Sequence, residues 1–111
     1  MKTRKVCLCR QISVPPHELR VAELCAANRE ISVSAFYRQA ADMLLHMSAD
    51  AQRDILRSLT KEPFFRFGIY IPEREWSAVR IKAARHRVAA SKFYRAAGLM
   101  LCDIINIVDG E

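Results

Sequence analysis

Positively charged side chains gather in two stretches of the chain that contain no acidic residue. The N-terminal arm carries Lys2, Arg4, Lys5 and Arg10. The stretch from 76 to 95 carries Arg80, Lys82, Arg85, Arg87, Lys92 and Arg95. Guanidinium and ammonium groups without neighbouring acids suit phosphate binding, and the chain has a formal net charge of +6 and a pI near 9.5. These charges favour a polyanionic partner, either nucleic acid or an anionic membrane surface.

The four cysteines do not have the spacing of a metal or redox site. Cys7 and Cys9 are separated by one residue, whereas zinc knuckles and thiol redox motifs have two residues between their cysteines. Cys25 and Cys102 fall in apolar helical stretches, where a free cysteine packs as a small hydrophobic residue. The three histidines share no helical face with the cysteines. We therefore expect reduced cysteines with a structural role, no metal and no cofactor.

No group of residues in the sequence suits catalysis. We find no carboxylate pair, no nucleophile with a base and no glycine-rich loop that would hold a phosphate. The chain is therefore not expected to be an enzyme.

Length and composition predict one folded domain. A chain of 111 residues is sufficient for one hydrophobic core, and 51% hydrophobic with 27% charged residues is the balance of a folded protein. No apolar run is long enough to span a bilayer, and no apolar signal-peptide segment follows the first residues. We therefore expect a cytoplasmic protein with no membrane partner.

The elements that must position the charged residues come as an internal repeat. A shift of 57 residues aligns 10–45 with 67–102 without a gap. The clearest match places SAFYRQAADML (34–44) beside SKFYRAAGLML (91–101). Further identities join Ile12 to Ile69, Pro15 to Pro72 and Glu18 to Glu75. So many matches in one register indicate two copies of one structural unit.

Each copy begins with a short strand. Residues 65–71 alternate apolar with other side chains and stop at Pro72, and residues 8–14 before Pro15 are a weaker version of the same pattern. A lone strand is unstable in water because its backbone groups lack partners. We therefore expect the two strands to pair with each other, antiparallel, within one chain.

Two amphipathic helices are predicted after each strand. The first starts at the proline and carries an apolar stripe of Leu19, Ala22 and Ala26, or of Trp76, Val79 and Ala83. The second opens near Ser32 or Ser34, and near Ser91, as N-cap residues. Its apolar stripe is Phe36, Ala40, Met43, Leu44 and Met47, or Phe93, Ala97, Met100, Leu101 and Ile104. In the turn between the helices, Asn28 suits a left-handed backbone, and the second copy has no obvious candidate.

The predicted fold is mainly α with a two-stranded antiparallel ribbon. Residues 1–111 form a single domain made of two repeats, 8–47 and 65–106, joined by a connector at 48–64. The connector contains a short helix over 50–59. The two repeats are expected to pack as an intrachain pseudo-dimer, with four helices stacked over the ribbon.

This arrangement resembles the ribbon-helix-helix (Arc/MetJ-like) family of DNA-binding proteins, in a tandem single-chain form. The resemblance lies in the strands that end at Val14-Pro15 and Ile71-Pro72 and in the second helices that open Ser-x-Phe-Tyr-Arg-x-Ala. It covers nearly the whole chain except the connector and the tail. In that family the ribbon enters the major groove of DNA, which is wide enough to admit two strands.

The resemblance implies two sets of contacts with DNA. The outward row of the ribbon holds Cys9, Gln11, Ser13, Arg66, Gly68 and Tyr70, of which base contacts are expected from Gln11, Ser13, Arg66 and Tyr70. Arg66 is the best candidate because arginine pairs with guanine through two hydrogen bonds. Phosphate contacts are expected at the N-termini of the second helices and from the basic stretches, through Lys5, Arg10, Ser32, Ser34, Arg85, Arg87, Ser91 and Lys92. Arg38 and Arg95 are candidates either for phosphate contacts or for ion pairs within the chain.

The predicted function is therefore binding of double-stranded DNA, as a small transcriptional repressor or an accessory protein of plasmid transfer (conjugation) or partition. The alternative is a protein-interaction module, antitoxin-like or an adaptor, that keeps the fold but has lost base readout, because Cys9 and Gly68 offer no base contact. Further self-association on DNA, or association with another protein subunit, stays open.

Overall fold

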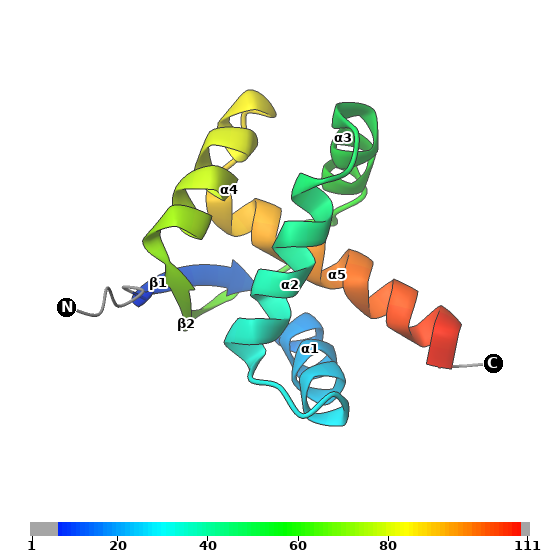
Figure 1. The fold of residues 1–111 in the computed structure, drawn as a ribbon. Helices are drawn as coiled ribbons and strands as arrows, with labels where there is room; N and C mark the ends of the chain where they lie inside the picture. The colour runs from blue at the N-terminus through cyan, green and yellow to red at the C-terminus, as the bar shows by residue number, and fades with distance from the viewer. Residues whose placement is uncertain (1–6, 110–111) are drawn as a thin grey trace.

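Residues 7–109 fold into two strands and five helices in the order β1-α1-α2-α3-β2-α4-α5 (Figure 1). The computed structural model describes residues 7–109, with the side chains of residues 7–106. The elements are β1 (Cys7–Val14), α1 (Pro16–Asn28), α2 (Val33–Leu45), α3 (Ala49–Arg57), β2 (Phe65–Pro72), α4 (Glu73–Arg85) and α5 (Ala90–Asp109). The predicted mainly helical architecture with one two-stranded antiparallel sheet is confirmed.

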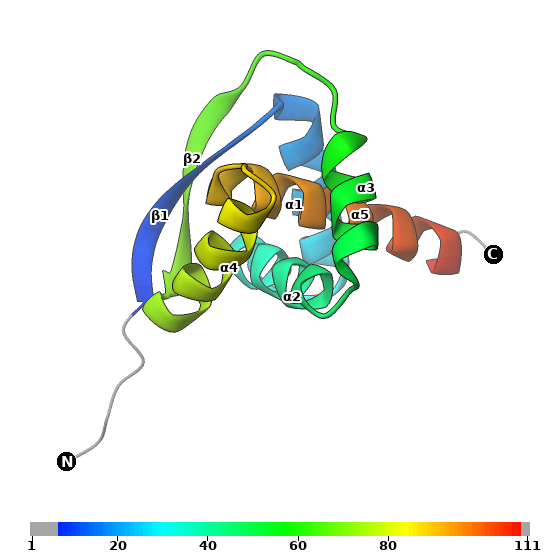
Figure 2. The ribbon, with the colours of Figure 1, turned by 90° about the horizontal axis from the view of Figure 1, so that it is seen from above.

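The ribbon formed by β1 and β2 is centred on the pair Gln11 and Gly68. These partners lie 57 positions apart, which is the offset that aligns the two halves of the sequence. In the C-terminal halves of β1 and β2, which lead into α1 and α4, every second side chain is buried. This confirms the predicted alternation of the strands. The buried positions are Ile12, Val14, Ile69 and Ile71. The helices all lie on that side of the ribbon, which leaves the other face open (Figure 2).

A proline joins each strand to the helix that follows. Pro15 and Pro72 are the N-cap residues of α1 and α4, with φ angles of −60° and −58°. The pyrrolidine ring holds φ near this value, and the missing N–H is harmless where no helical acceptor exists. The junction between strand and helix is therefore specified locally in both halves.

α2 and α5 pack against each other at the centre of the molecule and supply most of its aromatic core. Four of their rings are at most 2% exposed, those of Phe36, Tyr37, Phe93 and Tyr94. The predicted apolar stripes are wrong at their C-terminal ends, where Met43, Met47 and Ile104 are 37–39% exposed. Hydrophobic periodicity predicts one buried face along the whole helix. These helices instead bury two neighbouring faces near their N-termini, and their C-terminal ends extend away from the core.

α5 is 20 residues long and continues past the last predicted apolar position. Its Cys102 is buried beside Cys25 of α1, and burial together with this neighbour raises the pKa of the Cys102 thiol to about 12. Both thiols pack as small hydrophobic groups, as predicted. Among the described helices, neither α5 nor any other is long and apolar enough to cross a membrane.

Gly98 makes room for the Tyr37 ring where α2 and α5 pack together. A Cβ atom at position 98 would lie 2.6 Å from Cε1 of Tyr37, well inside van der Waals contact. Tyr37 also packs edge-on against Phe36, so its ring has little room to move aside. Burial raises the pKa of the Tyr37 hydroxyl above its usual value, as expected for a ring deep in the core.

Gly98→Ala is therefore expected to lower the free energy of unfolding by about 1 kcal/mol. Overpacking of a core costs about 1–3 kcal/mol, whereas alanine gains only about 1 kcal/mol over glycine in a helix. Urea unfolding of the two proteins measures the difference. An unchanged or higher stability would mean that the Tyr37 ring moves without strain.

Residues other than glycine take a left-handed backbone after the first helix of each half. Glu30 has a φ of 58° and Arg87 a φ of 60°. In both turns the next residue donates its backbone N–H to the carbonyl five positions earlier, at 3.0 and 3.1 Å. The prediction of Asn28 for this role is wrong, because Asn28 is the last residue of α1. The turn is set by Ile31 and Val88, which pack against the core and override local preference.

The connector is packed into the molecule through Gln52 of α3, which is 0% exposed. Its side-chain amide donates to three carbonyls at the C-terminal end of α2, those of Leu44, Leu45 and Met47, at 2.9, 3.3 and 3.1 Å. Its amide oxygen accepts a hydrogen bond of 2.9 Å from the ring of His86. α3 begins and ends within two residues of the predicted connector helix, but its role in joining α2 to the α4–α5 turn was not predicted.

Candidate nucleic-acid interface

The four predicted base-contact residues lie together on the open face of the ribbon. Gln11, Arg66 and Tyr70 are exposed and Ser13 is half-buried. Tyr70 is 61% exposed, the largest exposed fraction among the large hydrophobic side chains of residues 7–106. The outward direction of this row follows from strand alternation and was predicted. Contact of these residues with bases stays a prediction.

The register of the ribbon sets which of these residues are neighbours. Ser13 lies opposite Arg66 at one end, and Tyr70 lies opposite Cys9 toward the other. Gly68 sits at the centre, where a Cβ atom would lie 2.5 Å from Sγ of Cys9 and 3.7 Å from Nε2 of Gln11. Glycine at this position therefore makes room for the Cys9 thiol on the open face.

Two serine hydroxyls attach the second helices to the edges of the ribbon. The backbone N–H of Tyr70 donates to Oγ of Ser34 at 2.9 Å, and that of Ser13 donates to Oγ of Ser91 at 2.8 Å. These amides point away from the partner strand and would otherwise need water. Each serine hydroxyl keeps its own proton, which it can still donate to a ligand.

The predicted N-cap role is confirmed for Ser32 and wrong for Ser34 and Ser91. Ser32 caps α2, because its Oγ accepts from the backbone N–H of Ala35 at 3.0 Å. Ser34 and Ser91 lie inside the first turns of their helices. Their hydroxyls accept hydrogen bonds from the ribbon instead of from the first turn of their own helix. Local capping rules do not predict such a contact with a distant strand.

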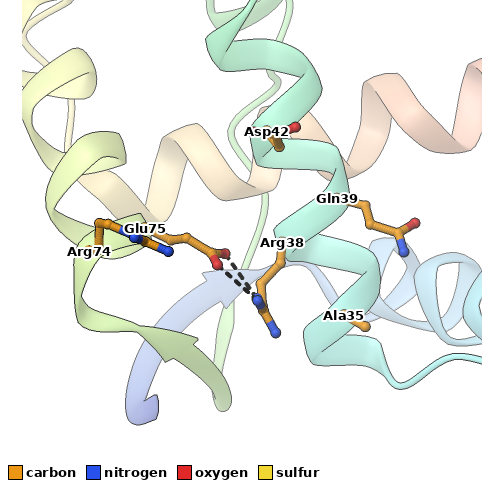
Figure 3. Close-up of a pocket in the computed structure, with 6 residues that line it drawn as sticks. All are labelled: Ala35, Arg38, Gln39, Asp42, Arg74 and Glu75. Carbon is orange, nitrogen blue, oxygen red and sulfur yellow. Dashed lines mark hydrogen bonds and ion pairs between the residues drawn. The ribbon is translucent and has the colours of Figure 1, made fainter. Parts of the chain in front are cut away.

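The two arginines one turn into the second helices form bidentate ion pairs across the molecule. Arg38 of α2 donates to both oxygens of Glu75 of α4 at 2.9 and 2.8 Å (Figure 3). Arg95 of α5 donates to both oxygens of Glu18 of α1, both at 2.8 Å. The carboxylate raises the pKa of the guanidinium in both pairs. Of the two alternatives that the sequence left open for these arginines, the structure therefore has the ion pairs.

The two ion pairs differ in burial. The side chains of Arg95 and Glu18 are 5% and 6% exposed, whereas those of Arg38 and Glu75 are 31% and 33% exposed. The Arg38 pair borders a hollow of about 470 Å³ between α2 and α4, which Figure 3 shows. The Arg95 guanidinium instead lies over the ring of Phe64, which belongs to the connector.

Arg10 lies on the side of the ribbon that faces the helices and pairs with an acidic residue of α4. Its side chain ion-pairs with Glu73 at 2.6 Å and its guanidinium lies 5.2 Å from the centre of the Trp76 ring. Arg10 shares its side of β1 with Ile12, the side that the helices cover. The Arg10 guanidinium therefore has partners within the chain, and its phosphate contact stays a prediction. Lys5, the other arm residue in that set, lies outside the described residues.

The remaining basic residues of the phosphate set gather at the α4–α5 turn. Arg85, Arg87 and Lys92 are exposed and line a hollow of about 410 Å³. Arg53 and Arg57 of α3 line the same hollow and were missed, because the connector was interpreted only as a spacer. Their spacing of four residues, which places them on one helical face, was the available signal.

A group of possible metal ligands is already compensated by an arginine. Among the described residues, His17, Glu18 and Glu62 place three ligand atoms within 4.8 Å of one another. Arg95 holds both oxygens of Glu18 and lies 3.8 Å from Glu62. The guanidinium therefore supplies the positive charge that a cation would bring to these carboxylates.

The expected DNA contacts thus divide into two groups. One is the open face of the ribbon, and the other is the basic surface at the α4–α5 turn. The N-terminus of α5 links them, because Lys92 lines the basic hollow and the neighbouring Ser91 is hydrogen-bonded to an edge of the ribbon. Comparison with known proteins found no match to this chain among family models, curated proteins or solved structures.

Proposed function

We propose that the chain is a duplicated ribbon-helix-helix protein that binds double-stranded DNA through its intrachain β-ribbon. The observation that carries this proposal is the open polar face of the ribbon, with the N-termini of α2 and α5 hydrogen-bonded to its two edges. A two-stranded ribbon fits the major groove, and helix N-termini beside it meet the phosphates that flank the groove.

The duplication is supported by contacts that occur twice, with every residue shifted by 57. A hydroxyl-to-strand hydrogen bond, a bidentate ion pair and a left-handed turn residue each recur in this way. The pairs are Ser34 to Tyr70 with Ser91 to Ser13, Arg38 to Glu75 with Arg95 to Glu18, and Glu30 with Arg87. Each contact except the turn joins one half to the other, which supports an arrangement of the two halves like that of the subunits of a dimer.

The open face has the chemistry that base edges require. Its outward row contains an arginine, a glutamine, a serine and a tyrosine, and no acidic residue. Arg66 is the residue suited to guanine, because its guanidinium can donate two parallel hydrogen bonds. The two strands differ at every equivalent outward position, so the preferred DNA site is asymmetric rather than palindromic.

The two halves also differ in charge where phosphates would lie. Arg85, Arg87 and Lys92 of the second half correspond to Asn28, Glu30 and Ala35 of the first. The second half therefore supplies most of the electrostatic attraction to the DNA backbone. The biological role we propose is that of a small transcriptional repressor or of an accessory protein in plasmid transfer or partition.

A titration with a mixed-sequence duplex at several salt concentrations tests DNA binding directly. Each phosphate contact contributes about −0.9 to the slope of log affinity against log salt, so the four charged residues Lys5, Arg85, Arg87 and Lys92 predict a slope of about −4. Absence of binding at low salt, or a slope near zero, would reject DNA binding and favour the protein-interaction module.

Arg66→Ala is expected to reduce the preference for a selected duplex over a scrambled one by about 1–3 kcal/mol, because a bidentate base contact is lost. The duplex comes from selection of bound sequences out of a random pool. Lys92→Ala is the matched control, since loss of a phosphate contact should weaken both duplexes alike. If the preference survives in Arg66→Ala, this face of the ribbon does not read the groove.

A further inference from the structure

The connector helix lies beside the basic α4–α5 turn rather than apart from the proposed DNA surface. The hollow of about 410 Å³ between them is lined by five cationic side chains and by no carboxylate. The cations are Arg53, Arg57, Arg85, Arg87 and Lys92. Two segments that are distant in sequence, α3 and the stretch from the end of α4 to the start of α5, thus place positive charge around one space.

Most of this charge is not paired with a carboxylate of residues 7–106. Arg53 pairs with Asp50 at 3.0 Å, on the exposed side of α3. None of the ion pairs among residues 7–106 includes the other four cations of the hollow, Arg57, Arg85, Arg87 and Lys92. Like charges held close together repel one another, and an anion in the hollow relieves that repulsion.

The position of α3 against this hollow is fixed by a buried hydrogen-bond network. Gln52 joins the C-terminal end of α2 to His86, which itself lines the hollow. Arg53 follows Gln52 directly, and Arg57 lies one helical turn further on the same face. The two arginines are therefore presented by an ordered element.

The hollow is also connected to the ribbon. Lys92 lines it, and the neighbouring Ser91 accepts a hydrogen bond from the backbone of Ser13 at the edge of β1. The first half has no equivalent surface, because Ala35 stands in place of Lys92 and Glu30 in place of Arg87, and the connector occurs only once in the chain.

We propose that α3 and the α4–α5 turn form one phosphate-binding surface. Through it the connector contacts the backbone of the bound duplex on the Ser13 side of the ribbon. This inference rests on the proposed DNA binding and adds a contact that the ribbon-helix-helix unit itself lacks. Recognition here is independent of base sequence, and it extends the footprint on one side only. With Arg53 and Arg57 included, six contacts give the intact protein a salt slope of about −5.4, against about −3.6 for four contacts.

The double variant Arg53→Gln/Arg57→Gln tests the inference against Arg20→Gln/Arg80→Gln, which removes the same charge from exposed positions on α1 and α4. Affinity for a mixed-sequence duplex is measured over a series of salt concentrations, and backbone protection by hydroxyl-radical footprinting. The first variant should lose at least tenfold in affinity near 0.1 M salt and about 2 in slope, because two phosphate contacts are lost. It should also lose protection at one end of the footprint. The control should keep both the slope and the full footprint.

The possible outcomes separate this inference from the function on which it rests. If the intact protein binds DNA and the two double variants behave alike, the connector does not contact the backbone, while the ribbon proposal stands. If the intact protein does not bind DNA at low salt, both proposals fail. A footprint of the intact protein that extends equally on both sides also overturns the one-sided contact, even if the variants prove unstable.

Discussion

Glu18→Ala is expected to lower the free energy of unfolding by about 3–5 kcal/mol, because it leaves a buried guanidinium without its carboxylate. The side chains of Glu18 and Arg95 are 6% and 5% exposed and share two hydrogen bonds of 2.8 Å. After the substitution Glu62, at 3.8 Å, is the one carboxylate of residues 7–106 that still forms an ion pair with Arg95. Urea unfolding followed by circular dichroism measures the loss.

The second half of the molecule provides the matched control for this experiment. Glu75→Ala removes the corresponding carboxylate from Arg38, but that pair is about one-third exposed and water can solvate the remaining charge. We expect a loss of about 1 kcal/mol there. Replacing both partners of the buried pair, as in Glu18→Leu/Arg95→Met, should recover most of the stability lost in Glu18→Ala, since no charge is then left buried. Equal losses in Glu18→Ala and Glu75→Ala would contradict burial as the cause.

Gln52→Leu is expected to cost about 3 kcal/mol, although the two side chains are similar in size. The amide of Gln52 donates to three carbonyls at the end of α2, and its oxygen accepts from His86. Each polar group left buried without a partner costs about 1–3 kcal/mol. Thermal and urea unfolding both measure this loss.

An exposed glutamine serves as the control for Gln52→Leu. Gln39 of α2 is exposed, so Gln39→Leu should change stability by no more than about 0.5 kcal/mol. His86→Phe, which removes the ring donor alone, should fall between the two. If Gln52→Leu proves as mild as Gln39→Leu, the connector is a tether and not a packed element, which would also weaken the case for Arg53 and Arg57 as a fixed surface.

Local chemistry was sufficient to predict most of the scaffold. Strand alternation correctly placed Ile12 and Ile69 toward the helices and Arg66 and Tyr70 toward solvent. The pairing of the two strands within one chain followed from their need for backbone partners, and the prolines marked where each strand gives way to a helix. These features depend on the order of neighbouring residues, which is what a sequence records.

Partners that are distant in sequence were decided only by the tertiary structure. In the sequence Arg10 is one of several cations of a basic arm. In the structure its position in β1 directs its side chain toward Glu73 and Trp76. The residues next to Arg38 and Arg95 in the sequence do not distinguish a phosphate ligand from an ion-pair partner. Carboxylates reach these arginines because α2 packs near α4 and α5 packs near α1. Charge and periodicity indicate that a charged side chain needs a partner of opposite charge. Which residue supplies that partner depends on how the helices pack against one another.

The division between sequence and structure is sharpest in the connector. From the sequence, residues 48–64 needed only to be long enough to join two repeats. In the folded chain Gln52 binds the end of α2, and Arg53 and Arg57 face the cations of the α4–α5 turn. The sequence by itself determined the two repeats and the outward row of the ribbon, because both follow from period and spacing. The tertiary structure decided where the basic residues converge, because α3 and the α4–α5 turn are separated along the chain and must pack together before their charges share one space.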